Sequence, residues 1–157
     1  MSALLANVEA INQGIRQACQ AAGRSVDSVQ LVAASKKQSV DSILALAALG
    51  QRDFGENTLQ EALPKIAASQ EAKLIWHYIG HIQSNKTKQI AEHFDWVQSV
   101  DRLSIAKRLD RHAGEAGRQL NVCVQVNISA EASKSGTTPE ELSALLHATA
   151  ELPHLRL

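Results

Sequence analysis

The chain alternates short apolar segments with longer segments of helical spacing, and this alternation is the strongest constraint on its fold. The short segments are rich in β-branched, aromatic or small apolar residues, as buried strands are. Because a helix-length segment separates each from the next, the strands must pair in parallel through right-handed crossovers. We therefore expect an α/β domain with a parallel sheet. Its strands are predicted at residues 29–34, 52–55, 74–80, 96–97 and 122–128, with another beginning at 155–157.

Helices are predicted where apolar residues recur three and four positions apart. They are expected at residues 3–22, 39–50, 59–67, 84–93, 101–116 and 139–151. Ser39 and Asp101 are typical N-terminal caps, and Pro139 suits a first helical position. Pro64 is expected to interrupt or kink the helix that contains it.

Two architectures satisfy this order of elements: an open doubly wound sheet and a (β/α) TIM-type barrel. The doubly wound nucleotide-binding fold lacks its signature, because no Gly-x-Gly-x-x-Gly or Gly-Lys-Ser/Thr loop follows a predicted strand. Polar residues stand instead at the C-terminal ends of successive strands, the face where barrels build their sites. These residues are Ser35, Lys36, Glu56, Asn57, His77, His81, Gln98, Ser99 and Asn127. The sequence therefore favours a barrel with a pocket at this face.

Lys36 directly follows the first predicted strand and is the strongest candidate for chemistry. Burial at the mouth of a strand disfavours the charged ammonium form, which makes the amine a better nucleophile towards a carbonyl. We therefore expect Lys36 to form a Schiff base. The alternative is that Lys36 only marks the point where the strand meets solvent. Asn57 and Ser84 are candidate hydrogen-bonding groups beside it.

The other candidate motifs are weaker. His77 and His81 have the i, i+4 spacing of a zinc pair on a helix, but they flank a strand end and lack a further ligand nearby, so we expect no metal there. His77 is a candidate pocket-lining group, with a structural histidine as the alternative. Within the polar loop 129–138, residues 133–137 could approach a phosphate through backbone amides or be a plain surface loop.

Composition argues against several function classes. Sixteen basic residues balance sixteen acidic ones and aromatic residues make up 3% of the chain, so we expect neither nucleic-acid nor membrane binding. The first residues show no basic region before an apolar stretch, so we expect no secretory signal and a cytoplasmic location. Cys19 and Cys123 are too few for a disulfide framework and are expected to be reduced core residues.

Several motifs together carry a specific resemblance to a known family. They are LVAASK (31–36), DFGEN (53–57), WHYIGHIQSNK (76–86), SVD (99–101), VQVN (124–127) and SKSG (133–136). With them the chain closely resembles, from end to end, the pyridoxal phosphate homeostasis proteins (the YggS/PROSC family). The resemblance implies a barrel of the alanine racemase N-terminal type that holds pyridoxal 5′-phosphate (PLP) as a Schiff base on Lys36. It also implies pocket positions at Asn57 and at Lys134.

The same resemblance implies a binding protein rather than an enzyme, because family members lack the second domain that supplies the other catalytic base of racemases. We expect a PLP carrier that takes part in intracellular PLP homeostasis and serves PLP-dependent client enzymes. Two alternatives stay open. One is a racemase-like PLP enzyme, and the other is a fragment that binds no cofactor and acts by interaction or oligomerisation.

Length is the departure from the family pattern. A full barrel needs roughly 200 residues or more, whereas this chain has 157 and ends on entering its sixth predicted strand. We expect a single PLP-binding barrel domain over residues 1–157 that is incomplete at its C-terminus. The family's remaining part supplies the loops that grip the PLP phosphate, so PLP affinity should be impaired. A full-length form is expected to be monomeric, and a truncated form could cover its open sheet edges by self-association.

Overall fold

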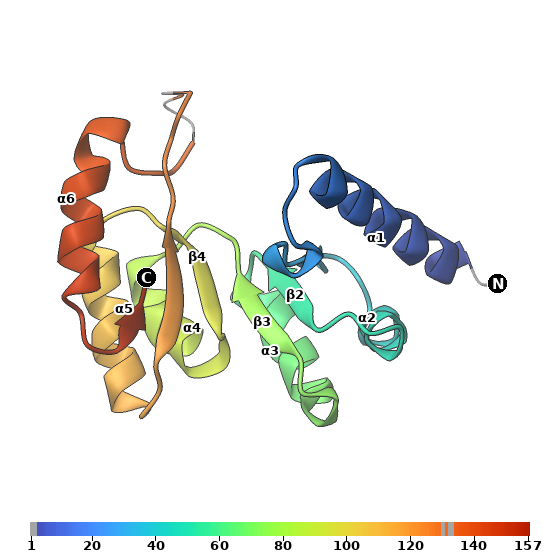
Figure 1. Cartoon of the computed structure of the whole chain (residues 1–157). Helices are drawn as coiled ribbons and strands as arrows, with labels where there is room; N and C mark the ends of the chain where they lie inside the picture. Colours follow the sequence, from blue (N-terminus) through green and yellow to red (C-terminus); the bar gives the residue numbers. More distant parts are fainter. Residues whose placement is uncertain (1–2, 130, 132–133) are drawn as a thin grey trace.

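A computed structural model of the chain describes residues 3–129, 131 and 134–157. Within these residues, six parallel strands form one sheet whose spatial order, β1-β2-β3-β4-β5-β6, is also their order in the sequence (Figure 1). The strands are β1 (Ala33–Ala34), β2 (Asp53–Glu56), β3 (Ile75–Tyr78), β4 (Trp96–Val100), β5 (Leu120–Val124) and β6 (Leu155–Arg156). Because this order never reverses, the sheet has no topological switch point. It therefore has the strand order of a (β/α) barrel, and the doubly wound alternative is wrong.

Every helix but the first follows a strand, and the third to sixth helices lie beside one another along the outside of the sheet. The helices are α1 (Ala3–Ala21), α2 (Val40–Ala48), α3 (Leu59–Ala68), α4 (Thr87–His93), α5 (Leu103–Glu115) and α6 (Pro139–Ala150), with short 3-10 turns η1 (Val26–Ser28), η2 (Gln70–Ala72) and η3 (Ser84–Lys86). Helix α3 packs beside α4, α4 beside α5, and α5 beside α6 (Figure 1). We call the opposite side of the sheet, which bears Ile75 and Ile79, the inner face. In the part of the chain that the structure describes, no helix has the length and apolar character needed to cross a membrane.

The hydrophobic core lies between the sheet and these helices. Phe54 of β2 packs against Trp76 of β3 with ring centroids 5.9 Å apart, and Tyr78 meets Phe94 edge-on at 5.2 Å. Leu109 of α5 joins the same cluster with no exposed surface. Each such side chain contributes about 1.5–3 kcal/mol by leaving water. Residues that pack in this core therefore lie on the outer face of their strands. Because side chains alternate along a strand, their immediate neighbours lie on the inner face.

Local signals explain most helix boundaries, with one exception. Ser39 caps α2 by accepting from the Ser42 amide, and Thr138 caps α6 just before Pro139. The predicted cap at Asp101 is wrong: α5 begins at Leu103 and its N-cap, Arg102, makes no side-chain capping bond. The Asp101 carboxylate instead accepts from the Arg102 side chain. Pro64 lies inside α3, which continues to Ala68, so the predicted interruption does not occur.

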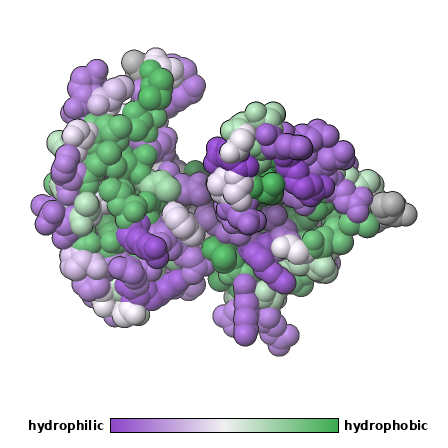
Figure 2. Space-filling view, in the orientation of Figure 1, coloured by the Kyte–Doolittle hydropathy of each residue, from purple (hydrophilic) through white to green (hydrophobic). Residues whose placement is uncertain are grey.

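The first strand differs most from expectation. Of the predicted 29–34 segment, only Ala33 and Ala34 pair with a neighbour, and Val29 is 38% exposed. The expected full burial is wrong because β1 is an edge strand that pairs with β2 alone. At the other side of the sheet, the ladder of β5 stops at Val124, and a single bridge joins Val126 to Thr137. Figure 2 shows apolar surface gathered over β5 and α6, whereas α1 presents mostly polar side chains.

Candidate functional site

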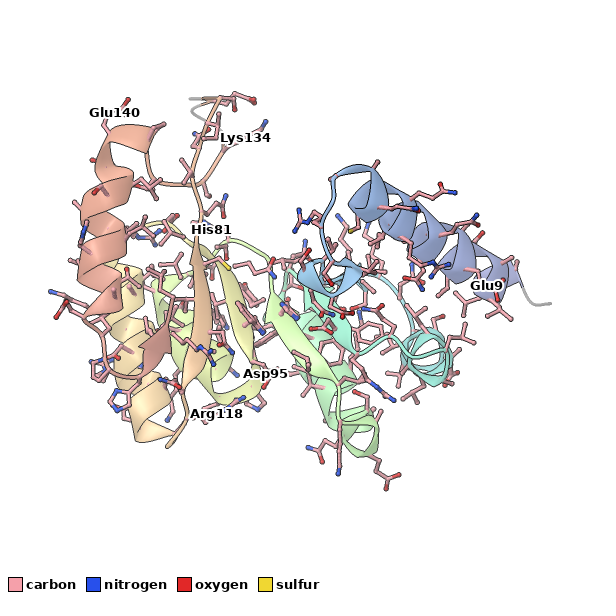
Figure 3. The ribbon with its side chains drawn as sticks, in the orientation of Figure 1. Glu9, His81, Asp95, Arg118, Lys134 and Glu140 are labelled. Atoms are coloured by element: carbon pink, nitrogen blue, oxygen red, sulfur yellow. The ribbon has the colours of Figure 1, made fainter. Side chains whose placement is uncertain are left out.

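The C-terminal ends of the strands form the edge where the sequence places the candidate site. Figure 3 shows His81 and Lys134 towards this edge, whereas Asp95 and Arg118 lie towards the opposite end. Asp95 and Arg118 form an ion pair of 2.9 Å between the segments that lead into β4 and β5. The two ends of the sheet are therefore distinct, and the chemistry-bearing residues that the motifs contain gather at the C-terminal one.

Lys36 lies in a tight turn directly after β1. The Gln38 amide donates to the Ser35 carbonyl at 3.0 Å, which puts Lys36 and Lys37 at the corner of the turn. Lys36 is exposed, so the burial expected at this position is absent, because β1 is an edge strand. The Lys36 side chain makes no hydrogen bond or ion pair with any residue that the structure describes. It is thus a free primary amine, the group that covalent capture of an aldehyde requires.

A buried polar cluster lies behind this turn. Glu56 is fully buried, and its Oε1 accepts from the Ser35 hydroxyl and from Nζ of Lys65, each at 2.7 Å. Nζ of Lys65 also donates to the Ser35 carbonyl at 2.9 Å. The Lys37 amide donates to Oε2 of Glu61 at 3.0 Å. Helix α3, which bears Glu61 and Lys65, therefore holds the backbone on both sides of Lys36.

Sequence reasoning missed Lys65. The signal was present, because Lys65 follows Ala62 by three positions and so lies on the buried face of α3. A lysine on such a face needs an anionic partner. Glu56, at the end of β2, supplies it.

The chain after β3 crosses closely over the chain after β2. A Cβ on Gly80 would overlap the Asn57 carbonyl, so only glycine fits there. Two hydrogen bonds keep the crossing in place: the Ile79 amide donates to the Glu56 carbonyl at 2.9 Å, and the Ser99 hydroxyl donates to the Gly80 carbonyl at 2.5 Å. Asn57 is half-buried. A hollow of about 230 Å³ beside it is lined by Asn57, Thr58, Leu59, Gln60, Tyr78, His81, Gln83 and Lys86.

A second hollow, of about 430 Å³, lies over the ends of β3 and β5. It is lined by Ile79, His81, Gln125, Val126, Asn127, Ile128, Ser129, Lys134 and Ser135. His81 borders both hollows, and its Nδ1 lies 3.0 Å from the Ser135 hydroxyl. The Lys134 ammonium forms a 2.6 Å ion pair with Glu131, which together with the Ser129 hydroxyl lowers the pKa of the Glu131 carboxyl. His81, which the sequence placed among the polar strand-end residues without assigning it a cofactor contact, therefore connects the surroundings of Asn57 and Lys134.

His77 and Ser84 do not join these hollows. His77 is buried on the inner face, with Nε2 2.9 Å from Oδ1 of Asp53 and Nδ1 3.0 Å from Nε2 of Gln98. Its ring stacks on Trp96 with centroids 5.7 Å apart. Ser84 is exposed at the start of η3, and its carbonyl accepts from the Thr87 hydroxyl. Among the described residues, no three His, Cys, Asp or Glu side chains are grouped so that they could hold a metal ion.

The sequence matches the family described as Alanine racemase, N-terminal domain over residues 6–157. Among curated relatives, the pyridoxal phosphate homeostasis protein of Pseudomonas aeruginosa is 53% identical over 157 residues, and that of Escherichia coli K12 is 44% identical over 160. Each alignment covers 100% of this chain and 68% of the relative. The chain thus spans about two thirds of the length of these relatives.

Solved structures give the same assignment. PipY of Synechococcus elongatus without PLP is 40% identical with a TM-score of 0.80, covering 91% of this chain and 67% of PipY. PipY with PLP bound is 39% identical with a TM-score of 0.78, and the match covers 91% of this chain and 66% of PipY. A histidine racemase of Leuconostoc mesenteroides, 14% identical with a TM-score of 0.68 over 98% of this chain and 38% of its own, shares the fold. The predicted barrel type is confirmed, and the chain belongs to the pyridoxal phosphate homeostasis proteins, a family built on the alanine racemase N-terminal domain.

Proposed function

We propose that this chain binds PLP through Lys36 and takes part in PLP homeostasis as a cofactor carrier. The observation that carries the proposal is the free, exposed amine of Lys36 on a braced turn at the C-terminal edge of the sheet. The names of the relatives and the PLP bound to PipY support it. A cytoplasmic location and delivery to PLP-dependent client enzymes are parts of the same proposal.

The residues at this edge fit the chemical groups of PLP. The aldehyde of PLP supplies a carbonyl that condenses with a primary amine, releasing water and leaving a covalent C=N bond. Lys36 provides such an amine, and Asn57 offers an amide that can both donate and accept. Lys134 and the Ser135 hydroxyl border the larger hollow and can interact with an anion there. Since His77 has partners on both nitrogens and Ser84 borders neither hollow, we assign them no contact.

The contacts of Tyr78 and His77, two candidate acid or base groups, favour a carrier function over racemisation. A racemase needs a second acid or base on the other side of the cofactor. The Tyr78 hydroxyl donates to the His81 carbonyl, and His77 is occupied by Asp53 and Gln98. We therefore expect no loss of optical activity when the PLP-loaded chain is incubated with L-alanine. Racemisation above the rate of free PLP would support the enzyme alternative instead.

Covalent trapping tests the attachment point. Purified chain is mixed with PLP, the absorbance of the C=N adduct is recorded, and borohydride reduction is followed by peptide mapping. We expect one reduced adduct on Lys36, its loss in Lys36→Ala, and its retention in Lys107→Ala, which removes an exposed lysine of α5. The same trapped adduct in Lys36→Ala, or no adduct in the wild-type chain, would refute the proposal.

Self-association is a second proposal, favoured by the two edges of the sheet. Among the described strands, β1 pairs with β2 alone and β6 pairs with β5 alone. Such edges expose unpaired amides and carbonyls that a second copy can bind. We expect sedimentation to show concentration-dependent association of the 157-residue chain. A monomer at all concentrations, with and without PLP, would exclude it.

A further inference from the structure

We propose that the buried Glu56–Lys65 ion pair, together with Ser35, positions Lys36 for capture of the cofactor. Neither charged group is needed as a reactant. Instead, the pair fixes the turn on which Lys36 stands. The inference rests on the proposed function of Lys36 as the point of attachment, and it adds two positioning residues, on β2 and α3, to that site.

The contacts of Lys65 are concentrated on this turn. Its ammonium donates to Oε1 of Glu56 at 2.7 Å and to the Ser35 carbonyl at 2.9 Å, and Oε2 of Glu61 lies 3.9 Å away. The Ser35 carbonyl accepts from the Gln38 amide as well, which closes the turn. One ammonium group therefore connects the last residue before Lys36 to two carboxylates, one from the neighbouring strand and one from its own helix.

The turn needs such support because its backbone is strained. Lys37 has φ of 60°, in the left-handed region that a side chain with a Cβ seldom adopts. Conformations of this kind persist only where the surrounding structure holds them. The hydrogen bond from the Lys37 amide to Glu61 acts directly on the strained residue, and Lys65 acts on Ser35 just before the corner. Together they restrict the backbone on both sides of Lys36.

Stability alone is a poor explanation for this pair. Removing two charges from water costs much of what their attraction returns, and apolar residues of similar volume often replace such pairs without loss of stability. Glu56 is fully buried, and its Oε2 has no hydrogen-bond partner among the described residues. The pair therefore retains a desolvation cost. An apolar pair could not replace the hydrogen bonds that Lys65 makes with the Ser35 carbonyl and Glu56 with the Ser35 hydroxyl.

The pair acts from the buried side of the turn that bears Lys36. Ser35 and Glu56 are buried, and Glu56 shares the outer face of β2 with Phe54 of the core. Lys36 follows Ser35 at the corner of the turn and is exposed. Lys65 and Glu56 are therefore placed to control the backbone of the turn, and they are positioning residues.

The test is the double variant Glu56→Met/Lys65→Met, which removes both charges together and leaves neither unpaired. We expect the chain to stay folded by circular dichroism. Exchange of the Lys37 amide with solvent should accelerate roughly tenfold: the amide keeps its acceptor Glu61, but the turn opens more often once the hydrogen bond from Lys65 to the Ser35 carbonyl is lost. Borohydride-trapped adduct on Lys36 at a fixed PLP concentration should form roughly tenfold to a hundredfold more slowly, because the amine is misplaced.

Two controls separate positioning from general destabilisation. Lys65→Arg keeps the positive charge and hydrogen-bond donors, so it should retain more of both the amide protection and the trapping rate than the double variant does. Arg118→Met breaks the Arg118–Asp95 pair at the opposite end of the sheet, so it should lower the unfolding temperature and leave both readouts at Lys36 and Lys37 unchanged. If the double variant does not fold, Ser35→Ala, which removes one hydroxyl and keeps the ion pair, repeats the test with an expected slowing of about fivefold.

The outcomes distinguish this inference from the proposed function. The positioning inference alone is overturned if the wild-type chain traps PLP on Lys36 and the folded double variant, or Ser35→Ala, traps it at the same rate. Unchanged exchange of the Lys37 amide in that variant overturns it as well. A wild-type chain that traps no PLP on Lys36 refutes the proposed function, and the inference that rests on it.

Discussion

The Asn57 carbonyl lies so close to Cα of Gly80 that a Cβ on Gly80 would overlap it. This contact joins the segment after β3 to the segment after β2 and sets the position of Asn57 beside its hollow. Gly80 has an ordinary backbone conformation, so the requirement for glycine comes from the approach of the two chains and not from φ. Close packing of backbone on backbone thus shapes the candidate site.

Gly80→Ala should lower the free energy of unfolding by about 1–3 kcal/mol, because an overpacked contact forces the backbone to shift. It should also weaken PLP capture, since Asn57 moves. The matched control is Gly14→Ala in α1, where nothing lies within 4 Å of the added Cβ. That change should raise the free energy of unfolding by about 0.5–1 kcal/mol, since alanine favours helix. Urea unfolding of both variants checks the prediction, and equal shifts of the same sign would contradict it.

The fold could be predicted from local sequence patterns, but the degree of burial of β1 could not. Apolar periodicity located the strand and helix segments because it is a property of neighbouring residues. The run from Val29 to Ala34 resembles a buried strand for the same reason. Its burial depends on whether a strand lies on each side of it, which no local pattern records. In this structure one side has none, so Ala34 and Lys36 are exposed.

The candidate site was predicted in part for a similar reason. Asn57 and Lys36 both follow a strand at the C-terminal edge, as the strand-end rule predicts, whereas Lys36 lines neither hollow. Lys65 was not selected, and His81 was placed at the edge without a contact of its own, because their roles come from contacts between segments distant in the sequence. His77 satisfied the strand-end rule but points along the inner face to Asp53 and Gln98. The position of a residue in a strand therefore predicts that it lies at this edge. Its hydrogen-bond partners could be identified only from the structure.

A row of hydrogen-bonded polar side chains on the inner face gives a second prediction. The Asp53 carboxylate is buried and accepts from Nε2 of Gln30 at 2.6 Å and from Nε2 of His77 at 2.9 Å. Asp53→Ala removes both acceptors, and should lower the free energy of unfolding by about 1–3 kcal/mol because buried donors lose their partner. Urea unfolding measures the loss.

A double-mutant cycle identifies its cause. His77→Phe and Asp53→Ala in one chain should together cost less than the sum of the single changes, since a phenyl ring in place of the imidazole leaves no unsatisfied ring nitrogen. Strict additivity of the two free-energy changes would show that Asp53 and His77 do not interact, contrary to the structure.

Thiol labelling gives a third prediction. Burial raises the pKa of the Cys123 thiol above its ordinary 9.0, and Cys19 is 3% exposed. Because the thiolate is the reactive form, alkylation of the folded chain should stay slow until the pH exceeds 9.0. Iodoacetamide labelling followed by mass spectrometry checks this, and Cys123→Ser identifies the site. Labelling of the folded chain as fast as that of the urea-unfolded chain would contradict the prediction.

Tyr78 gives the fourth prediction, and it is the only tyrosine in the sequence, so its titration can be followed without interference. Burial raises the pKa of its hydroxyl above the ordinary 10.0, and the hydroxyl donates to the His81 carbonyl at 3.2 Å. Phenolate absorbance of the folded chain should therefore appear at higher pH than in urea. Tyr78→Phe should abolish the signal. A midpoint at or below that of the urea-unfolded chain would contradict burial.

The raised pKa of Tyr78 also contributes to the dependence of stability on alkaline pH. Below 10.0 the phenol is protonated in both the folded and the unfolded chain, so it contributes no pH dependence. As the pH rises through 10.0, the unfolded chain loses the proton first and is favoured, because the folded chain binds more protons. The free energy of unfolding should therefore fall with pH above 10.0 in the wild-type chain and fall less steeply in Tyr78→Phe. Urea unfolding of both chains at a series of alkaline pH values measures the difference, and parallel curves would show that Tyr78 titrates alike in the two states.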